Sequence, residues 1–263
     1  MATILDNKHP SSPSVFSPVA LLREARRQKG LTAVDVPRVC ILDPDGDIVG
    51  ELRRQGRSKP FEGWACYHTQ MEAFRLVGQT VGIIGCAVGA PFAVLIAEEL
   101  FASGCRFLLS LTSSGQIVAA GPTPYFVIID RALRDEGTSY HYAPPAEYAL
   151  AEAQLVTLAA EAVKQTGIRT FVGATWTTDA PFRETAEAID AARKREILAV
   201  EMEAAALYTF AQMRHAAVLC LAHVTNTMAQ SGQDFEKGEA SGTKDALAIL
   251  GAIVERFYST IKL

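Results

Sequence analysis

The chain has 263 residues, and its 25 Lys and Arg against 29 Asp and Glu give a formal net charge of −4. Apolar residues make up 49% and charged residues 21%, which are the proportions of a folded globular protein and exclude a disordered chain. Because a mildly acidic chain has no basic surface for nucleic acids or anionic membranes, we expect a partner of neither class.

The N-terminal residues and the cysteines exclude further classes of protein. Residues 1–18 carry Asp6, Lys8 and His9 where a secretory signal would need apolar residues. No apolar run approaches the ~18 residues of a membrane span. The five cysteines are scattered and form no CxxC pair, which argues against zinc sites and disulfide scaffolds. We therefore expect a cytoplasmic protein without a metal site.

Strand and helix patterns alternate along the chain after a polar arm. Residues 1–35 predict this arm, with one short helix at 19–29, and residues 36–263 predict a single domain. The expected strands are 37–42, 74–85, 106–111, 125–130, 170–175, 199–200 and 216–226. The expected helices are 91–103, 146–165, 184–197, 204–215 and 244–261. The polar, Gly-rich residues 227–242 are expected to form a mobile flap. This alternation predicts an α/β protein whose mostly parallel or mixed sheet has helices on both faces.

Two polar clusters follow predicted strands. Residues 82–91 (GIIGCAVGAP) join a strand to a helix, a turn whose N–H groups can approach an anion. They lack the GxGxxG spacing, and the next strand ends without an acid for a cofactor ribose, so a dinucleotide site is excluded. Residues 110–116 (SLTSSGQ) place small hydroxyl side chains at a strand end. The residues themselves leave a ligand crevice and a simple Ser/Thr turn equally open.

The third cluster is the most specific one. Residues 200–208 are VEMEAAALY, so Glu201 and Glu203 flank Met202 where an apolar strand becomes an apolar helix. Carboxylates buried there without partners would be costly, whereas acids at a helix start are stabilised by the helix dipole. The pattern by itself leaves a ligand-binding role and a helix-start role open.

VEMEAAALY strongly resembles the signature of the nucleoside phosphorylase superfamily. The unit at 83–111 is similar to the family's strand, glycine turn, helix and strand, and segments 132–142 and 172–185 are similar to its uridine phosphorylase-like branch. The resemblance runs from about Val39 to the C-terminus. It implies a three-layer αβα sandwich around a distorted mixed β-sheet, a homo-oligomer (dimer or hexamer), and cleavage of the N-glycosidic bond of a nucleoside.

The resemblance also implies roles for individual residues. Glu203 matches the glutamate that holds the ribose hydroxyls while C1′ becomes electron-poor, so it is the expected catalytic residue. The expected substrate-binding residues are Met202 beneath the sugar, Glu201 as a supporting acid, Gly89 and Ser113 beside the nucleophile, Phe182 and Asn226 at the base, and His141 at the sugar 5′ end. No metal or organic cofactor is implied, and inorganic phosphate is the expected co-substrate of a phosphorylase.

The phosphate side departs from the family pattern. Gly46 stands where the family's first loop has an arginine, Tyr67 or His68 where the neighbouring subunit lends a second, and Ser110 where a third precedes the hydroxyl cluster. Arginines hold phosphate through paired hydrogen bonds, and here the first loop contains Asp43 and Asp45 instead. Gly46, Ser110 and Ser113 are therefore the residues expected on the phosphate or water side.

Phosphorolysis is the family default, and two alternatives stay open. In the first, water replaces phosphate, as in the nucleosidase members; in the second, the chain binds nucleosides without turnover. Arg131, Arg134, Arg183 or His68 could also substitute for the family's arginines. Asn226 stands where purine-cleaving members have an aspartate, and an amide cannot supply a proton to the base.

Overall fold

The structure, a computed structural model, describes residues 3–228 and 234–260. Its strands are β1 (Val39–Asp43), β2 (Ser58–Pro60), β3 (Glu72–Leu76), β4 (Gln79–Gly85), β5 (Phe107–Gln116), β6 (Tyr125–Asp135), β7 (Tyr148–Leu150), β8 (Thr170–Thr178), β9 (Ala199–Glu201) and β10 (Ala217–Asn226). Its helices are α1 (Pro18–Lys29), α2 (Asp47–Arg54), α3 (Ala90–Ala102), α4 (Ala153–Val163), α5 (Ala186–Arg193), α6 (Ala204–Arg214) and α7 (Thr243–Thr260). Short 3₁₀ turns are η1 (Ser139–His141), η2 (Lys164–Thr166), η3 (Pro181–Arg183) and η4 (Glu239–Gly242).

The strands form one ten-stranded mixed sheet in the order β10-β6-β8-β9-β5-β1-β4-β3-β2, with β7 paired to β6. Because β10 also pairs with β5, the strands β5, β10, β6, β8 and β9 close into a ring, and the remaining strands extend from β5. Strands β4, β1, β5 and β10 are parallel to their neighbours in this order. Their carboxyl ends therefore share one edge of the sheet, the place where α/β proteins bind ligands.

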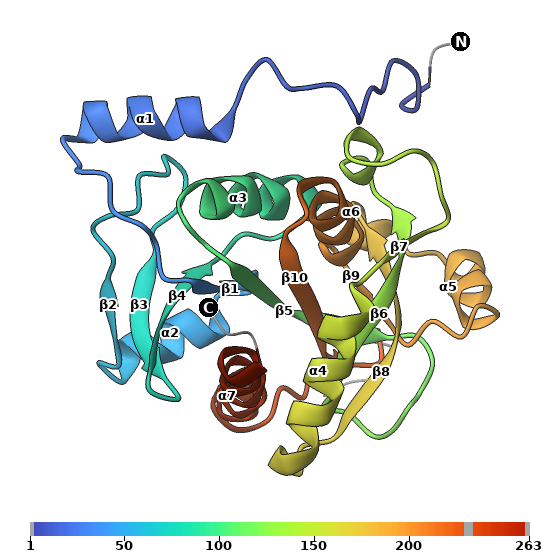
Figure 1. Cartoon of the computed structure of the whole chain (residues 1–263). Coiled ribbons are helices and arrows are strands. Elements are labelled where there is room, and N and C mark those ends of the chain that lie inside the picture. The colour runs from blue at the N-terminus through green and yellow to red at the C-terminus, as the bar shows by residue number, and fades with distance from the viewer. Residues whose placement is uncertain (1–2, 229–233, 261–263) are drawn as a thin grey trace.

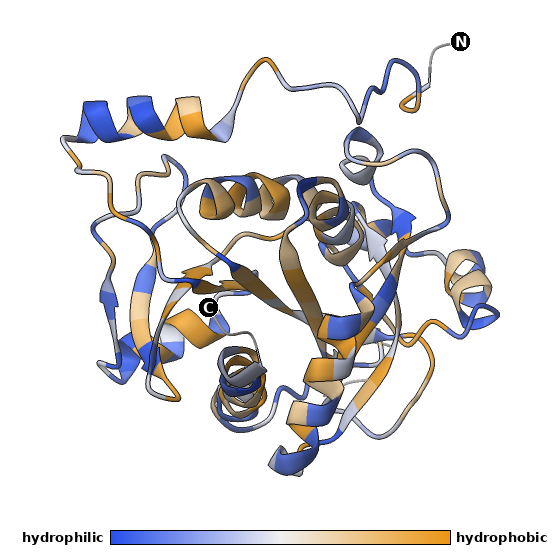
Figure 2. Ribbon diagram, in the orientation of Figure 1, coloured by the Kyte–Doolittle hydropathy of each residue, from blue (hydrophilic) through white to orange (hydrophobic). Residues whose placement is uncertain are grey.

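Helices cover both faces of the sheet. Figure 1 shows α3 and α6 on one face and α2, α4 and α7 on the other, with α1 lying outside α3. Each face has its own apolar cluster, one including α3 and α6 and the other including α4 and α7. Figure 2 shows apolar residues along the central strands and along α3. The predicted three-layer arrangement around a mixed sheet is confirmed.

The structure differs from the predicted elements in several places. Strand β2 was not predicted, and β5, β6 and β8 run beyond their predicted ends, so residues 112–116 belong to β5 and do not form a loop after it. The single strand expected at 74–85 is a hairpin of β3 and β4, because Val77 and Gly78 both have positive φ and reverse the chain. The helix expected at 146–165 begins only at Ala153, since residues before it pair with β6 as β7. Helix α2 was not predicted, and it begins directly after Gly46, whose φ of +81° starts the turn.

Part of the predicted flap at 227–242 is anchored. The backbone and hydroxyl of Thr227 donate hydrogen bonds to Asp234 at 2.7–3.0 Å. Glu236 N donates to the Thr225 carbonyl at 2.8 Å, and Lys237 Nζ binds the carboxylate of Asp47. Residues 229–233 of the flap, like the predicted helix end at 261, lie outside the described residues. Within the described ranges, none of the helices is both long and apolar enough to traverse a bilayer.

Candidate active site

Glu203 lies at the carboxyl edge of the sheet, where α6 begins beside the start of α3. Its Oε1 accepts a hydrogen bond from Gly89 N at 2.7 Å, and only 1% of the residue is exposed. Its Oε2 is buried and has no hydrogen-bond partner among the described residues. Burial and the nearby charge of Glu201 raise the pKa of Glu203 to about 8. A buried polar atom without a partner is costly, so this oxygen is placed to bond with a hydroxyl-bearing ligand, as an acceptor when Glu203 is ionised above about pH 8 and as a donor or acceptor when it is protonated below that pH.

Glu201 has a different environment, although it lies two residues away. Its Oε1 accepts from the hydroxyls of Thr175 and Thr177 on β8. Its Oε2 accepts from the backbone N–H groups of Glu203 and Ala204, each at 2.7 Å. Burial raises the pKa of this carboxyl, and the four donors oppose that shift. Both oxygens are fully engaged inside the protein, so Glu201 fastens β8 to the start of α6 and positions Glu203.

The phosphate or water side is formed by the loop between β1 and α2. Asp45 Oδ2 accepts from the backbone N–H of Ser113 on β5 at 2.6 Å. Gly46 could not carry a side chain there without moving Cys86, because an added Cβ would lie 2.6 Å from Cys86 Sγ. Ser110 is buried within the sheet, between β1 and β10. The structure thus brings Asp45, Gly46 and Ser113 together and leaves Ser110 buried three residues earlier on β5.

The expected base side is less closely assembled. Asn226 Oδ1 accepts from Met228 N at 2.9 Å and its Nδ2 donates to Thr225 Oγ1 at 3.2 Å, so both ends of the amide have internal partners. Met228 packs against Gly115 at the end of β5, where an added Cβ would lie 2.3 Å from the sulfur. Phe182, on η3, is 98% exposed. Phe182 lines a cavity of about 440 Å³ together with Met228. Met202, which lies between Glu201 and Glu203 in the sequence, is half-buried.

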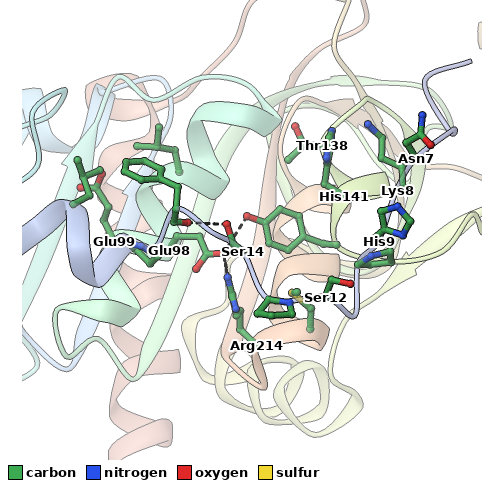
Figure 3. A pocket seen from close by; sticks show the side chains of 18 residues that line it. Asn7, Lys8, His9, Ser12, Ser14, Glu98, Glu99, Thr138, His141 and Arg214 are labelled. Atoms are coloured by element: carbon green, nitrogen blue, oxygen red, sulfur yellow. Dashed lines mark hydrogen bonds and ion pairs between the residues drawn. The ribbon is translucent and has the colours of Figure 1, made fainter.

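His141 lies apart from these residues, in a cavity of about 610 Å³ under the N-terminal arm (Figure 3). The cavity is bounded by the arm, α3, η1 and the end of α6, and neither Glu203 nor Ser113 lines it. Its prominent polar contact is Glu98, which accepts from Arg214 at 2.8 Å and from the Tyr142 hydroxyl at 3.1 Å. The predicted contact of His141 with a sugar stays a prediction.

Two features of the site were missed in the sequence. Thr175 and Thr177 are two positions apart on β8, so their side chains lie on the same face of the strand, and both hydroxyls donate to Glu201. The spacing of these two threonines is a signal in the sequence by which they could have been recognised as partners of a buried group. Nothing in the sequence links Asp45 with Ser113, which lies 68 residues away. In the described part of the chain, no three or more His, Cys, Asp or Glu side chains gather as a metal site would require.

Asp43 gives the stability of the protein a testable pH dependence. It is buried and accepts from Val49 N at 2.9 Å, and burial, followed by the charges of Asp45 and Asp47, raises its pKa to about 7. The unfolded chain loses this proton near pH 4, so the stabilisation is present at low pH and disappears as pH rises through 7. Between pH 5 and pH 9, Asp43→Asn should gain about 3 kcal/mol of unfolding free energy relative to the wild type.

Urea denaturation at the two pH values measures this gain. Asp190→Asn on the exposed side of α5 is the matched control. An Asp43→Asn variant whose stability difference from the wild type is the same at pH 5 and pH 9 would contradict the assignment.

Known proteins that resemble this chain identify its family and fold. Residues 38–255 match the family model of the phosphorylase superfamily, and the chain belongs to that family. It is 26% identical over 234 residues to a uridine phosphorylase of Thermococcus kodakarensis, covering 82% of this chain and 83% of the relative. It is 28% identical over 190 residues to a DeoD-type purine nucleoside phosphorylase of Roseobacter denitrificans, covering 68% of this chain and 74% of the relative.

A solved structure of uridine phosphorylase from Vibrio fischeri superposes with a TM-score of 0.73. The superposition covers 89% of this chain and 99% of the Vibrio fischeri chain, and the two sequences are 19% identical. This likeness establishes the shared fold. The resemblance predicted from VEMEAAALY is confirmed by the family match.

Proposed function

We propose that this protein is an enzyme that cleaves the N-glycosidic bond of a nucleoside. The observation that carries the proposal is the carboxylate of Glu203, which is held by Gly89 N on one oxygen and has a buried, unpartnered second oxygen. A ribose offers two adjacent hydroxyl donors, which is the chemistry that such an oxygen lacks. The names of the relatives, uridine phosphorylase and purine nucleoside phosphorylase, support a nucleoside as the substrate.

The buried carboxylate would act on the transition state. As the C1′–N bond breaks, its electron pair moves to the base and positive charge develops on C1′ and the ring oxygen. The ionised form of Glu203, which prevails above its pKa of about 8, places a negative charge on the diol side that stabilises this cation more than the neutral substrate and so accelerates the reaction. Glu201 contributes indirectly, because its bonds to Glu203 N and Ala204 N hold the catalytic carboxylate in position.

Two acceptors for the pentose are to be distinguished. Phosphorolysis, with inorganic phosphate as co-substrate, is the reaction that the family and the relatives' names support. Hydrolysis is the second candidate, and the contact between Asp45 and Ser113 N favours it. The family also supports a cytoplasmic homo-oligomer, a dimer or hexamer, without nucleic-acid or membrane partners.

A nucleoside panel tests the proposed function. The protein is incubated with purine and pyrimidine nucleosides, with and without phosphate, and free base, ribose and ribose 1-phosphate are measured. Release of free base supports the proposal. A folded protein that releases no base from any nucleoside contradicts it. If the same nucleosides then raise its melting temperature, the protein binds them without turnover.

A further inference from the structure

We infer that the carboxylate of Asp45 occupies the place an anionic acceptor would take, and that this enzyme therefore uses water as its acceptor. The inference rests on the proposed cleavage of a nucleoside and concerns only the second reactant. It is carried by the contact between Asp45 and β5, by the position of Asp45 relative to Glu203, and by the charges around the same loop.

The contact places a negative group on a donor at the ligand-binding edge of the sheet. Ser113 follows the buried part of β5, and its N–H donates to Asp45 Oδ2 at 2.6 Å. Backbone N–H groups at such an edge are the donors that a bound oxyanion would use. Here the chain supplies its own carboxylate to that donor. Asp45 is exposed, so water has access to it.

Asp45 belongs to the same site as the sugar-holding carboxylate. Its charge is among those that raise the pKa of Glu203, after burial and Glu201. Glu203 in turn binds Gly89 N, which begins the helix next to this loop. Asp45 therefore lies within electrostatic reach of the carboxyl group that would hold the pentose.

The surrounding charges disfavour phosphate. Asp43 at the end of β1 and Asp47 at the start of α2 flank the loop that carries Asp45, and the charges of Asp45 and Asp47 help to raise the pKa of Asp43. The ammonium group of Lys237 lies beside this loop and forms an ion pair with Asp47. His223 is buried against Phe126 with its pKa lowered to about 4, so it is uncharged at neutral pH. A phosphate dianion would meet these carboxylates without a free cation from this set.

The same arrangement suits water. A water molecule donates one hydrogen bond to the Asp45 carboxylate and attacks C1′ with its oxygen. The C1′–O bond forms as the C1′–N bond breaks, and the bonding pair leaves with the base nitrogen. The water proton moves to Asp45 and then to solvent, while the departing base takes up a proton from solvent. The products are the free pentose and the free base, so atoms and charges balance.

Two variants and a binding measurement test the inference. Asp45→Asn keeps the shape of the side chain but removes the base, and we expect hydrolysis to fall about 100-fold, as for loss of a general base. In Asp45→Ala the Ser113 N–H is free and one like charge is removed, so calorimetry should show inorganic phosphate binding about 10-fold more tightly than to the wild type. Asp245→Asn, the same charge change at an exposed position on α7, should alter neither result.

Three results would overturn the inference. The first is wild-type formation of ribose 1-phosphate at a rate that saturates with phosphate. The second is an Asp45→Asn variant that hydrolyses nucleosides like the wild type. The third is equal phosphate affinity in wild type and Asp45→Ala. A wild type that cleaves no nucleoside refutes the proposed function instead, and the phosphate titration still decides whether Asp45 holds the anion position.

Discussion

Replacing Glu203 with glutamine should lower kcat/KM for nucleoside cleavage by about 100- to 1000-fold without unfolding the protein, as for loss of one preorganised charged group. The amide can still accept from Gly89 N, so the backbone contact of the carboxylate is kept. What is lost is the negative charge that Glu203, ionised above its pKa of about 8, would place opposite the electron-poor C1′. The amide also removes a buried acid whose pKa is about 8, so stability above that pH should be equal to or greater than that of the wild type.

Steady-state kinetics on a cleaved nucleoside, together with urea denaturation, measure both parts of this prediction. Glu187→Gln, an exposed glutamate in the first turn of α5, is the matched control and should retain wild-type kinetics. A Glu203→Gln variant with full activity would remove the sugar-holding role. A variant that loses activity because it is unfolded would show that the carboxylate is structural.

Replacing Glu201 with alanine should have its main effect on folding. The substitution leaves the buried N–H groups of Glu203 and Ala204 without an acceptor, and it removes the partner of Thr175. Each buried donor left unpaired costs about 1–3 kcal/mol, so we expect an unfolding free energy lower by about 2–5 kcal/mol. Glu201→Gln retains a carbonyl acceptor and should lose less.

Urea denaturation of the two variants measures the loss. The comparison with Glu203 is informative, because the two glutamates differ in function although they are separated by one residue. If Glu201→Ala were as stable as the wild type and defective only in catalysis, Glu201 would be a substrate ligand, as the family resemblance implied, and its role in fastening β8 to α6 would be secondary.

The sequence was sufficient for the architecture because local patterns carry it. Apolar strands and amphipathic helices alternate, and that alternation predicts helices on both faces of a sheet. The errors fell where the local signal was ambiguous. Residues 74–85 contain one apolar pattern that spans two strands. The chain reverses at Val77 with a positive φ, which β-branched residues rarely adopt, so the valine gives no signal for the turn. Strand β7 is three residues long and exists because β6 offers it an edge.

The site was predicted unevenly for a related reason. VEMEAAALY indicated the family and the importance of Glu203, because the motif is local and specific. It could not separate Glu203 from Glu201, since their difference depends on Thr175 and Thr177 on another strand. His141 matched a family segment, yet the structure places it in a cavity beneath the N-terminal arm. Its role depends on neighbours that the segment does not contain.

By itself, the sequence determined the α/β class and the family, and it singled out Glu203 as the candidate catalytic carboxylate, because each is encoded in contiguous residues. The tertiary structure decided which glutamate has an oxygen free for a ligand and which is fully bonded inside the protein. It also brought Asp45 to the N–H of Ser113, 68 residues away. Hydrogen bonds and burial depend on which strands are neighbours, and that pairing is set by the packing of the whole sheet.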